Sequence, residues 1–141
     1  MQGFKLIKMF TILYMSEWYR KLNKAPWTPP DWVFGVVWSI LYLLMGISFF
    51  LVWTNKKCYP YCNPLLYFLV QLGFNLMWTT LFFEYKKPEW AMFDLILTYV
   101  FTIYTYVEFK TISNAASLLL LPYLAWLTLA FTLNAYVVLY N

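Results

Sequence analysis

Two tryptophans inside long apolar stretches are the side chains whose chemistry most needs an explanation. Trp126 lies near the middle of its stretch, where the indole N–H has no water to bond, and a buried indole normally finds a partner. Trp38 continues through Tyr42, Met45 and Phe49 at spacings of four, three and four, which places these residues on one helix face. Such a stripe indicates helix packing more often than a ligand site, and both interpretations stay open.

Three amides lie in the same apolar stretches. Gln71 and Asn75 are four residues apart and therefore share a helix face. Asn134 follows Trp126 by eight residues, with Ala130 between them, so these three also share a face. Amides deep in a bilayer must be satisfied by other helices, a cavity or a ligand. They therefore predict either hydrogen bonds between helices or the lining of a pocket.

Two further residues interrupt the apolar stretches. Pro122 removes a backbone hydrogen bond to Leu118, which predicts a kink that opens space beside Trp126. Asp94 is the one acid of its stretch and lies only a turn from the membrane interface. A helix-start acid, or one that reaches back to the interface, is the favoured interpretation, and a place in a pocket lining is the alternative.

The composition indicates that membrane-spanning helices position these side chains. Hydrophobic residues make up 63% of the 141 residues, and charged residues only 11%, against about 25% in a soluble domain. This excludes intrinsic disorder and disfavours a soluble domain. The absence of histidine removes the usual general base and metal ligand, so we expect no metal site. The net charge of +4 forms no basic stripe, so we expect no nucleic-acid partner.

Four apolar runs are long enough to span a membrane as helices, which takes about 20 residues each. They cover about residues 29–54, 65–83, 90–107 and 115–140, and the polar connections between them are short. Short connections predict antiparallel neighbours, so we expect an all-α, polytopic transmembrane helix bundle in a single domain over residues 1–141. A β-barrel is disfavoured because the runs do not alternate with period two.

The segment before these runs divides into a partial or interfacial first helix at residues 1–16 and a loop at residues 17–31. At the end of the loop, Thr28 is a candidate N-cap, with Pro29 and Pro30 in the first helical turn. Asp31 then completes an arrangement like a capping box. The first long helix is therefore predicted to begin at Pro29.

Other residues have interpretations that need no ligand. Trp32, Trp53 and Trp90 lie at the ends of apolar runs and fit the aromatic belts of a membrane protein. Cys58 and Cys62 lie in one short polar segment and either form a local disulfide or stay free.

Motifs along the chain together resemble the TspO/MBR family of translocator and tryptophan-rich sensory proteins. They are Trp-Tyr-x-x-Leu-x-Lys at 18–24, Trp-Thr-Pro-Pro at 27–30, Trp-Val-x-Gly-x-Val-Trp at 32–38, Gln-x-x-x-Asn-x-x-Trp at 71–78 and Pro-Tyr-Leu-Ala-Trp at 122–126. They occur in order and cover almost everything from Trp18 onwards.

The resemblance implies a five-helix membrane bundle, commonly dimeric, that binds porphyrins such as protoporphyrin IX and haem. It also implies cholesterol in some members and synthetic benzodiazepine-type ligands, with no required cofactor. By position it places ligand-binding residues at Tyr19, Pro29, Pro30, Trp38, Gln71, Asn75, Trp78 and Trp126, to which we add Asn134 from its shared face with Trp126.

The chain departs from the family pattern in two ways that matter for function. Few residues precede Trp18, so we expect four full spans and a short first helix. No Lys or Arg follows Tyr136, so the cholesterol motif of the last helix is incomplete, and porphyrin ranks above cholesterol as the ligand.

Three functions therefore stay open. The first is a non-enzymatic receptor or carrier in which the macrocycle stacks against Trp38 and Trp126 under the 17–31 loop. The second is light- and oxygen-dependent breakdown of the bound porphyrin by the same tryptophans. The third is a structural membrane subunit whose aromatic residues only pack. The resemblance implies the mitochondrial outer membrane in a eukaryotic setting and a cell-envelope membrane in a bacterial one.

Overall fold

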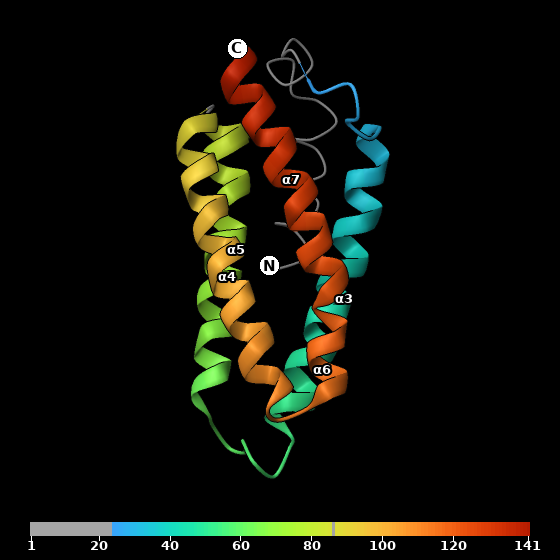
Figure 1. The fold of residues 1–141 in the computed structure, drawn as a ribbon, viewed down its shortest axis with the longest axis vertical. Helices are drawn as coiled ribbons and strands as arrows, with labels where there is room; N and C mark the ends of the chain where they lie inside the picture. The colour runs from blue at the N-terminus through green and yellow to red at the C-terminus, as the bar shows by residue number, and fades with distance from the viewer. Residues whose placement is uncertain (1–23, 86) are drawn as a thin grey trace.

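The structure is a computed structural model that describes residues 24–85 and 87–141. The predicted first helix, residues 17–23 of the loop and the candidate Tyr19 lie outside the described residues. In chain order the elements are α3 (Asp31–Trp53), α4 (Asn63–Thr79), the π-helical turn η1 (Thr80–Glu84), α5 (Pro88–Lys110), α6 (Asn114–Leu119) and α7 (Leu121–Tyr140). The described residues contain helices and no strand, so the predicted all-α class is confirmed (Figure 1).

Four segments within the described residues are long and apolar enough to cross a membrane. They are 32–53, 63–82, 88–110 and 114–140, and the last runs through α6 and α7 together. Large apolar side chains cover the outside of the bundle, including Leu43 at 64% exposed and Phe93 at 59%. A surface of this kind is stable only against hydrocarbon. The chain is therefore an integral membrane protein.

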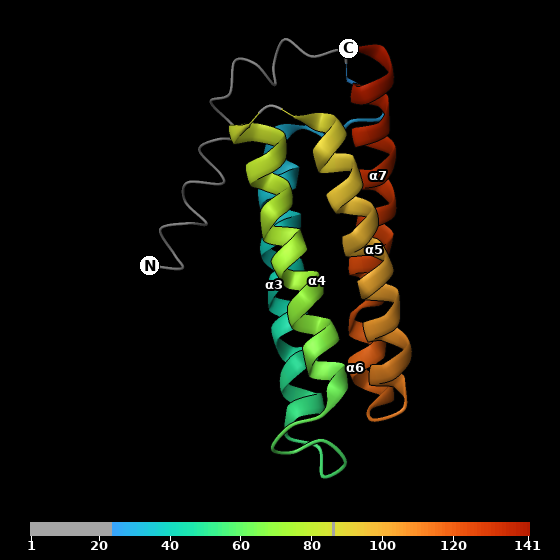
Figure 2. The same cartoon turned by 90° about the vertical axis from the view of Figure 1, so that its left-hand side faces the viewer.

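The helices are not packed evenly around the bundle. α4 packs along α5, and α5 packs along α7, whereas α3 packs mainly on α6 near its C-terminal end. Figure 1 shows α7 close to α3 at the α6 end and leaning away from it toward the opposite end. Figure 2 shows the same bundle from the side, with α4 beside α3 and α5 beside α7. The backbone of the N-terminal half of α3 is therefore not closely packed against the other helices, and long side chains bridge the distance.

The first long helix begins at Asp31, so the predicted start at Pro29 is wrong. Pro30 is the N-cap residue with extended backbone angles, and no side chain caps the helix. The reason is steric, because a residue before proline is pushed out of the α region, and both Thr28 and Pro29 precede a proline. The N–H of Thr28 instead donates to the carbonyl of Ala25 at 3.0 Å in a turn.

The last span is broken at Leu120, as Pro122 predicts. α6 ends at Leu119 and α7 begins at Leu121, with Pro122 in the first turn of the new helix. Proline is tolerated there because the first amides of a helix have no partner within it. The interruption lies next to Trp126, so it shapes the region where the candidate site is expected.

The connection between α3 and α4 is closed by a disulfide between Cys58 and Cys62, which decides the alternative that the sequence left open. The indole N–H of Trp53 donates to the carbonyl of Pro60 at 3.1 Å across this connection. Trp32, Trp53 and Trp90 are 59%, 38% and 63% exposed near the ends of their helices. Exposure at helix ends is what an aromatic belt requires.

Candidate functional site

Aromatic side chains from α3 and α7 form a cluster between these helices. The rings of Trp38 and Trp126 meet edge to face, with centroids 6.2 Å apart and an interplanar angle of 87°. Trp38 also stacks on Tyr42 at 5.7 Å and touches Tyr123 at 6.4 Å, and Phe34 meets Trp126 at 5.6 Å. The two candidate tryptophans, 88 positions apart in the sequence, are therefore in direct contact.

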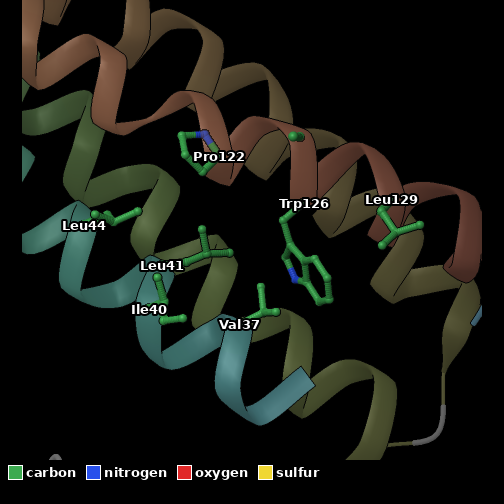
Figure 3. Close-up of a pocket in the computed structure, with 8 residues that line it drawn as sticks. Val37, Ile40, Leu41, Leu44, Pro122, Trp126 and Leu129 are labelled. Carbon is green, nitrogen blue, oxygen red and sulfur yellow. The ribbon is translucent and has the colours of Figure 1, made fainter. Parts of the chain in front are cut away.

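One face of Trp126 borders a groove between α3 and α7, which we call the α3–α7 groove. Its volume is about 520 Å³, and it is lined by Val37, Ile40, Leu41, Leu44, Pro122, Ala125, Trp126 and Leu129. Figure 3 shows the indole of Trp126 extending from α7 across this space toward Val37 of α3. The lining side chains are apolar, and the indole nitrogen of Trp126 is itself buried. The groove therefore suits an apolar molecule that stacks on the indole.

Below the aromatic cluster, hydrogen bonds join all four long helices through a set of side chains that we call the polar layer. It consists of Tyr42, Gln71, Asn75, Thr102 and Tyr123. Tyr42 donates to the amide oxygen of Asn75 at 2.6 Å, and the Asn75 amide nitrogen donates to the Tyr123 hydroxyl at 2.6 Å. Tyr123 donates to the Gln71 oxygen at 2.8 Å, and Thr102 approaches the same oxygen at 3.2 Å. In this structure both amides bond between helices.

A second set of hydrogen bonds joins the helices where α4 ends and α5 begins. The indole N–H of Trp78 donates to the amide oxygen of Asn134 at 2.9 Å, and the Asn134 amide nitrogen donates to the carbonyl of Pro88 at 3.0 Å. This links α4, α7 and the start of α5. Both candidate residues are therefore hydrogen-bonded between helices, and a ligand contact for either one stays a prediction.

Among the residues that the structure describes, two buried polar groups have no hydrogen-bond partner. They are the indole nitrogen of Trp126 and the carboxyl group of Asp94, of which both oxygens are unpartnered. Asp94 is only 3% exposed on α5, so its interpretation as an acid that reaches back to the interface is wrong. Buried polar atoms are usually satisfied, so each exception needs an explanation. In the sequence, an isolated acid within an apolar run marks Asp94 as unusual. The sequence does not show which way its side chain faces.

The loop before α3 reaches across to α7. The indole N–H of Trp27 donates to the Thr132 hydroxyl at 3.1 Å, and its ring meets Tyr136 edge to face at 5.8 Å. Thr132 follows Leu129 of the groove by three residues on α7. The loop therefore lies over the end of the groove nearest the C-terminus. Pro29 and Pro30 belong to this loop and do not line the groove.

The described side chains of this site offer contacts that could hold a ligand. Among the described residues, no three Cys, Asp or Glu side chains gather as a metal site would require. The site offers aromatic faces for stacking, one free N–H donor and one buried carboxyl group. Fold and site together define a polytopic helical membrane protein with an aromatic cluster inside the bundle.

Comparisons with known proteins identify the family. The family model described as TspO/MBR matches residues 2–140, so the chain belongs to the TspO/MBR family. It is 38% identical over 126 residues to the "Tryptophan-rich protein TspO" of Chlorobaculum tepidum, covering 89% of this chain and 80% of that protein. It is 40% identical over 120 residues to the "Translocator protein" of Homo sapiens, covering 84% and 71%. The "Tryptophan-rich sensory protein" of Cereibacter sphaeroides is 35% identical over 123 residues, covering 87% and 76%.

Proposed function

We propose that this protein is a non-enzymatic membrane receptor or carrier for a flat tetrapyrrole, of which protoporphyrin IX and haem are representatives. The observation that supports the proposal most is the unpartnered indole N–H of Trp126 beside an apolar groove. A structural tryptophan in hydrocarbon would be expected to have a partner, as Trp78 does with Asn134. A ligand that supplies an acceptor explains why Trp126 has none.

The geometry limits how the ligand is held. The rings of Trp38 and Trp126 are already in contact, so a macrocycle does not fit between them as they stand. The face of Trp126 that borders the α3–α7 groove is available for stacking without rearrangement. We therefore propose that the macrocycle first lies in the groove against Trp126, with Trp38 supporting the indole from behind. The Trp27 contact with α7 closes the end of the groove.

Titration of purified protein with protoporphyrin IX, followed by tryptophan fluorescence, tests this function. Replacing both Trp38 and Trp126 with Ala should weaken binding by at least about tenfold. Stacking of a flat heteroaromatic ring on one aromatic side chain, as measured for nucleobases, contributes about 1–3 kcal/mol. Trp90→Ala is the matched control, since Trp90 is exposed at the start of α5 and lies outside the site. Unchanged affinity in the double variant would contradict the proposal.

A thermal-shift series separates a ligand-binding protein from one whose aromatic residues only pack. A molecule that binds the folded state raises its melting temperature by mass action. Protoporphyrin IX and haem should raise the melting temperature more than cholesterol does. No shift with any of them would favour the structural subunit.

We further propose that two copies associate in the membrane. The outer face of α3 contains Gly46, where an added Cβ would meet nothing within 4 Å, so a second helix can approach closely. Crosslinking in native membranes tests this association. The membrane itself is proposed to be the mitochondrial outer membrane in a eukaryotic setting and the cell envelope in a bacterial one.

A further inference from the structure

The carboxyl group of Asp94 is buried inside the bundle without a hydrogen-bond partner. Asp94 is 3% exposed, and neither of its oxygens accepts a hydrogen bond in the structure. Burying such a group without partners opposes folding. It makes no bond of the polar layer and none of the Trp78–Asn134 connection. Its presence is therefore not explained by holding helices together.

Asp94 lies on α5, the helix that borders the aromatic cluster through Leu95 and Thr98. It belongs to the inner face of α5, and the hydroxyl of Thr98, one turn further on, donates to its backbone carbonyl at 2.9 Å. Thr98 and the neighbouring Leu95 line a small internal cavity together with Trp38 and Trp78. That cavity has a volume of about 10 Å³, which is near the lower limit for one water molecule. The buried carboxyl group therefore belongs to the helix that borders this cavity, although Asp94 itself is not one of the lining residues.

We propose that Asp94 recognises paired N–H donors of the ligand, so that the preferred ligands are open-chain tetrapyrroles rather than metal-loaded macrocycles. The inference rests on the proposed function and names its ligand class. Two unpartnered oxygens of one carboxyl group match two neighbouring N–H groups, as a bidentate pair does. In an open-chain tetrapyrrole, a terminal lactam N–H and the N–H of the neighbouring pyrrole ring have this arrangement. In a metal-loaded porphyrin the metal has replaced the inner hydrogens, and no N–H is left.

The second unpartnered group supports the same ligand class. Trp126 has a free N–H donor, and an open-chain tetrapyrrole ends in lactam rings whose carbonyl oxygens are acceptors. Such a ligand therefore offers donors for Asp94 and an acceptor for Trp126. Access to Asp94 requires the Trp38 ring to move, because the internal cavity is too small for a pyrrole ring. The sparse packing of the N-terminal half of α3 against α4 and α7 permits this movement.

Two ligands that share their propionates but differ in N–H donors test the inference. Biliverdin presents N–H groups, whereas nickel(II) protoporphyrin IX has none, and its square-planar metal takes up axial ligands weakly. Each is titrated into wild-type protein, Asp94→Asn, Asp94→Leu and the control Thr105→Val. Thr105 is on the same helix, and its hydroxyl donates only to the backbone carbonyl of Phe101. Its variant therefore changes no proposed ligand contact.

Asp94→Leu should weaken biliverdin binding by at least about tenfold, with less than a twofold change for the nickel porphyrin. Asp94→Asn, which keeps the shape and one acceptor oxygen, should give a smaller loss for biliverdin only and decides the matter if the Leu variant does not fold. Equal losses for both ligands, or none for either, would overturn the inference and leave the proposed function standing. Binding of neither ligand to wild-type protein would overturn both.

Discussion

The residues of the polar layer and the pair Asp94 and Trp126 are all polar side chains that lie inside the same bundle. They differ in whether they have hydrogen-bond partners. In the polar layer, the single amide of Asn75 accepts a hydrogen bond from Tyr42 and donates another to Tyr123. By contrast, the carboxyl group of Asp94 and the indole nitrogen of Trp126 are buried without a hydrogen-bond partner. Buried polar groups that bond one another stabilise the fold, whereas those left unpaired oppose it and are available to a ligand. The contrast separates structural residues from binding residues inside one hydrophobic interior.

The largest effect is expected from breaking the polar layer. Asn75→Ala leaves the Tyr42 hydroxyl without its acceptor and removes the amide donor to Tyr123, which keeps its bond to Gln71. The free energy of unfolding should therefore fall by about 2–3 kcal/mol. Thermal or denaturant unfolding in detergent micelles measures it. Asn63→Ala, at an exposed amide at the start of the same helix, is the control and should change it by less than about 0.5 kcal/mol. Equal losses in both variants would remove the distinction.

Removing the unpaired carboxyl group should act in the opposite direction. Asp94→Leu replaces a buried group without partners by an apolar one of similar size, so the free energy of unfolding should rise by about 1–2 kcal/mol. The same unfolding assay, without ligand, measures the change. Asp94→Asn should give little of this gain, because the amide is also polar and unpartnered. A loss of stability in the Leu variant would indicate that Asp94 supports the fold.

Two tryptophans provide a matched pair for the indole N–H. Trp78 uses its N–H on Asn134, whereas Trp126 does not use its own. Trp78→Phe should therefore lower the free energy of unfolding by about 1 kcal/mol more than Trp126→Phe does. Ligand titration should give the reverse order, with the greater loss of affinity in Trp126→Phe. A greater loss of stability for Trp126→Phe would contradict the assignment.

The smallest effect is expected at a position that belongs to neither region. Gly46→Ala adds a methyl group that meets nothing within 4 Å on the outer face of α3. Alanine favours a helix over glycine, so the free energy of unfolding should rise by about 0.5–1 kcal/mol. Unfolding at low protein concentration measures it. A loss of stability that grows with protein concentration would show that a second chain contacts this face.

The sequence predicts the helices, and the family resemblance assigns Trp38 and Trp126 to one pocket, but neither predicts their direct contact or the hydrogen-bond partners. Run length and hydropathy decide which segments span the membrane, and both are local properties. Pro122 likewise predicts the break before α7, because proline acts within its own turn. The bond between Tyr42 and Asn75 joins positions 33 residues apart, and it depends on how each helix is rotated about its axis. Periodicity leaves that rotation open in helices that are apolar on every side.

The inward orientation of Asp94 was missed for the same reason. Its position near the start of the run favours an interfacial acid, and only the packing of α5 between α4 and α7 directs its face inward. The start of α3 was missed for a different reason, since the capping interpretation of Thr28 neglected the restriction that consecutive prolines place on the residues before them.

The π-helical turn η1 has a consequence for the length of the polypeptide. There the N–H of Tyr85 donates to the carbonyl of Thr80, one residue further back than in an α-helix. Deleting a single residue within 80–84 would leave an ordinary α-helical turn and keep α4 in place. The same deletion between Asn75 and Trp78 would rotate these two residues against each other by about 100° and disrupt their separate hydrogen bonds. Insertions and deletions among homologous chains are therefore expected at this turn rather than within α4.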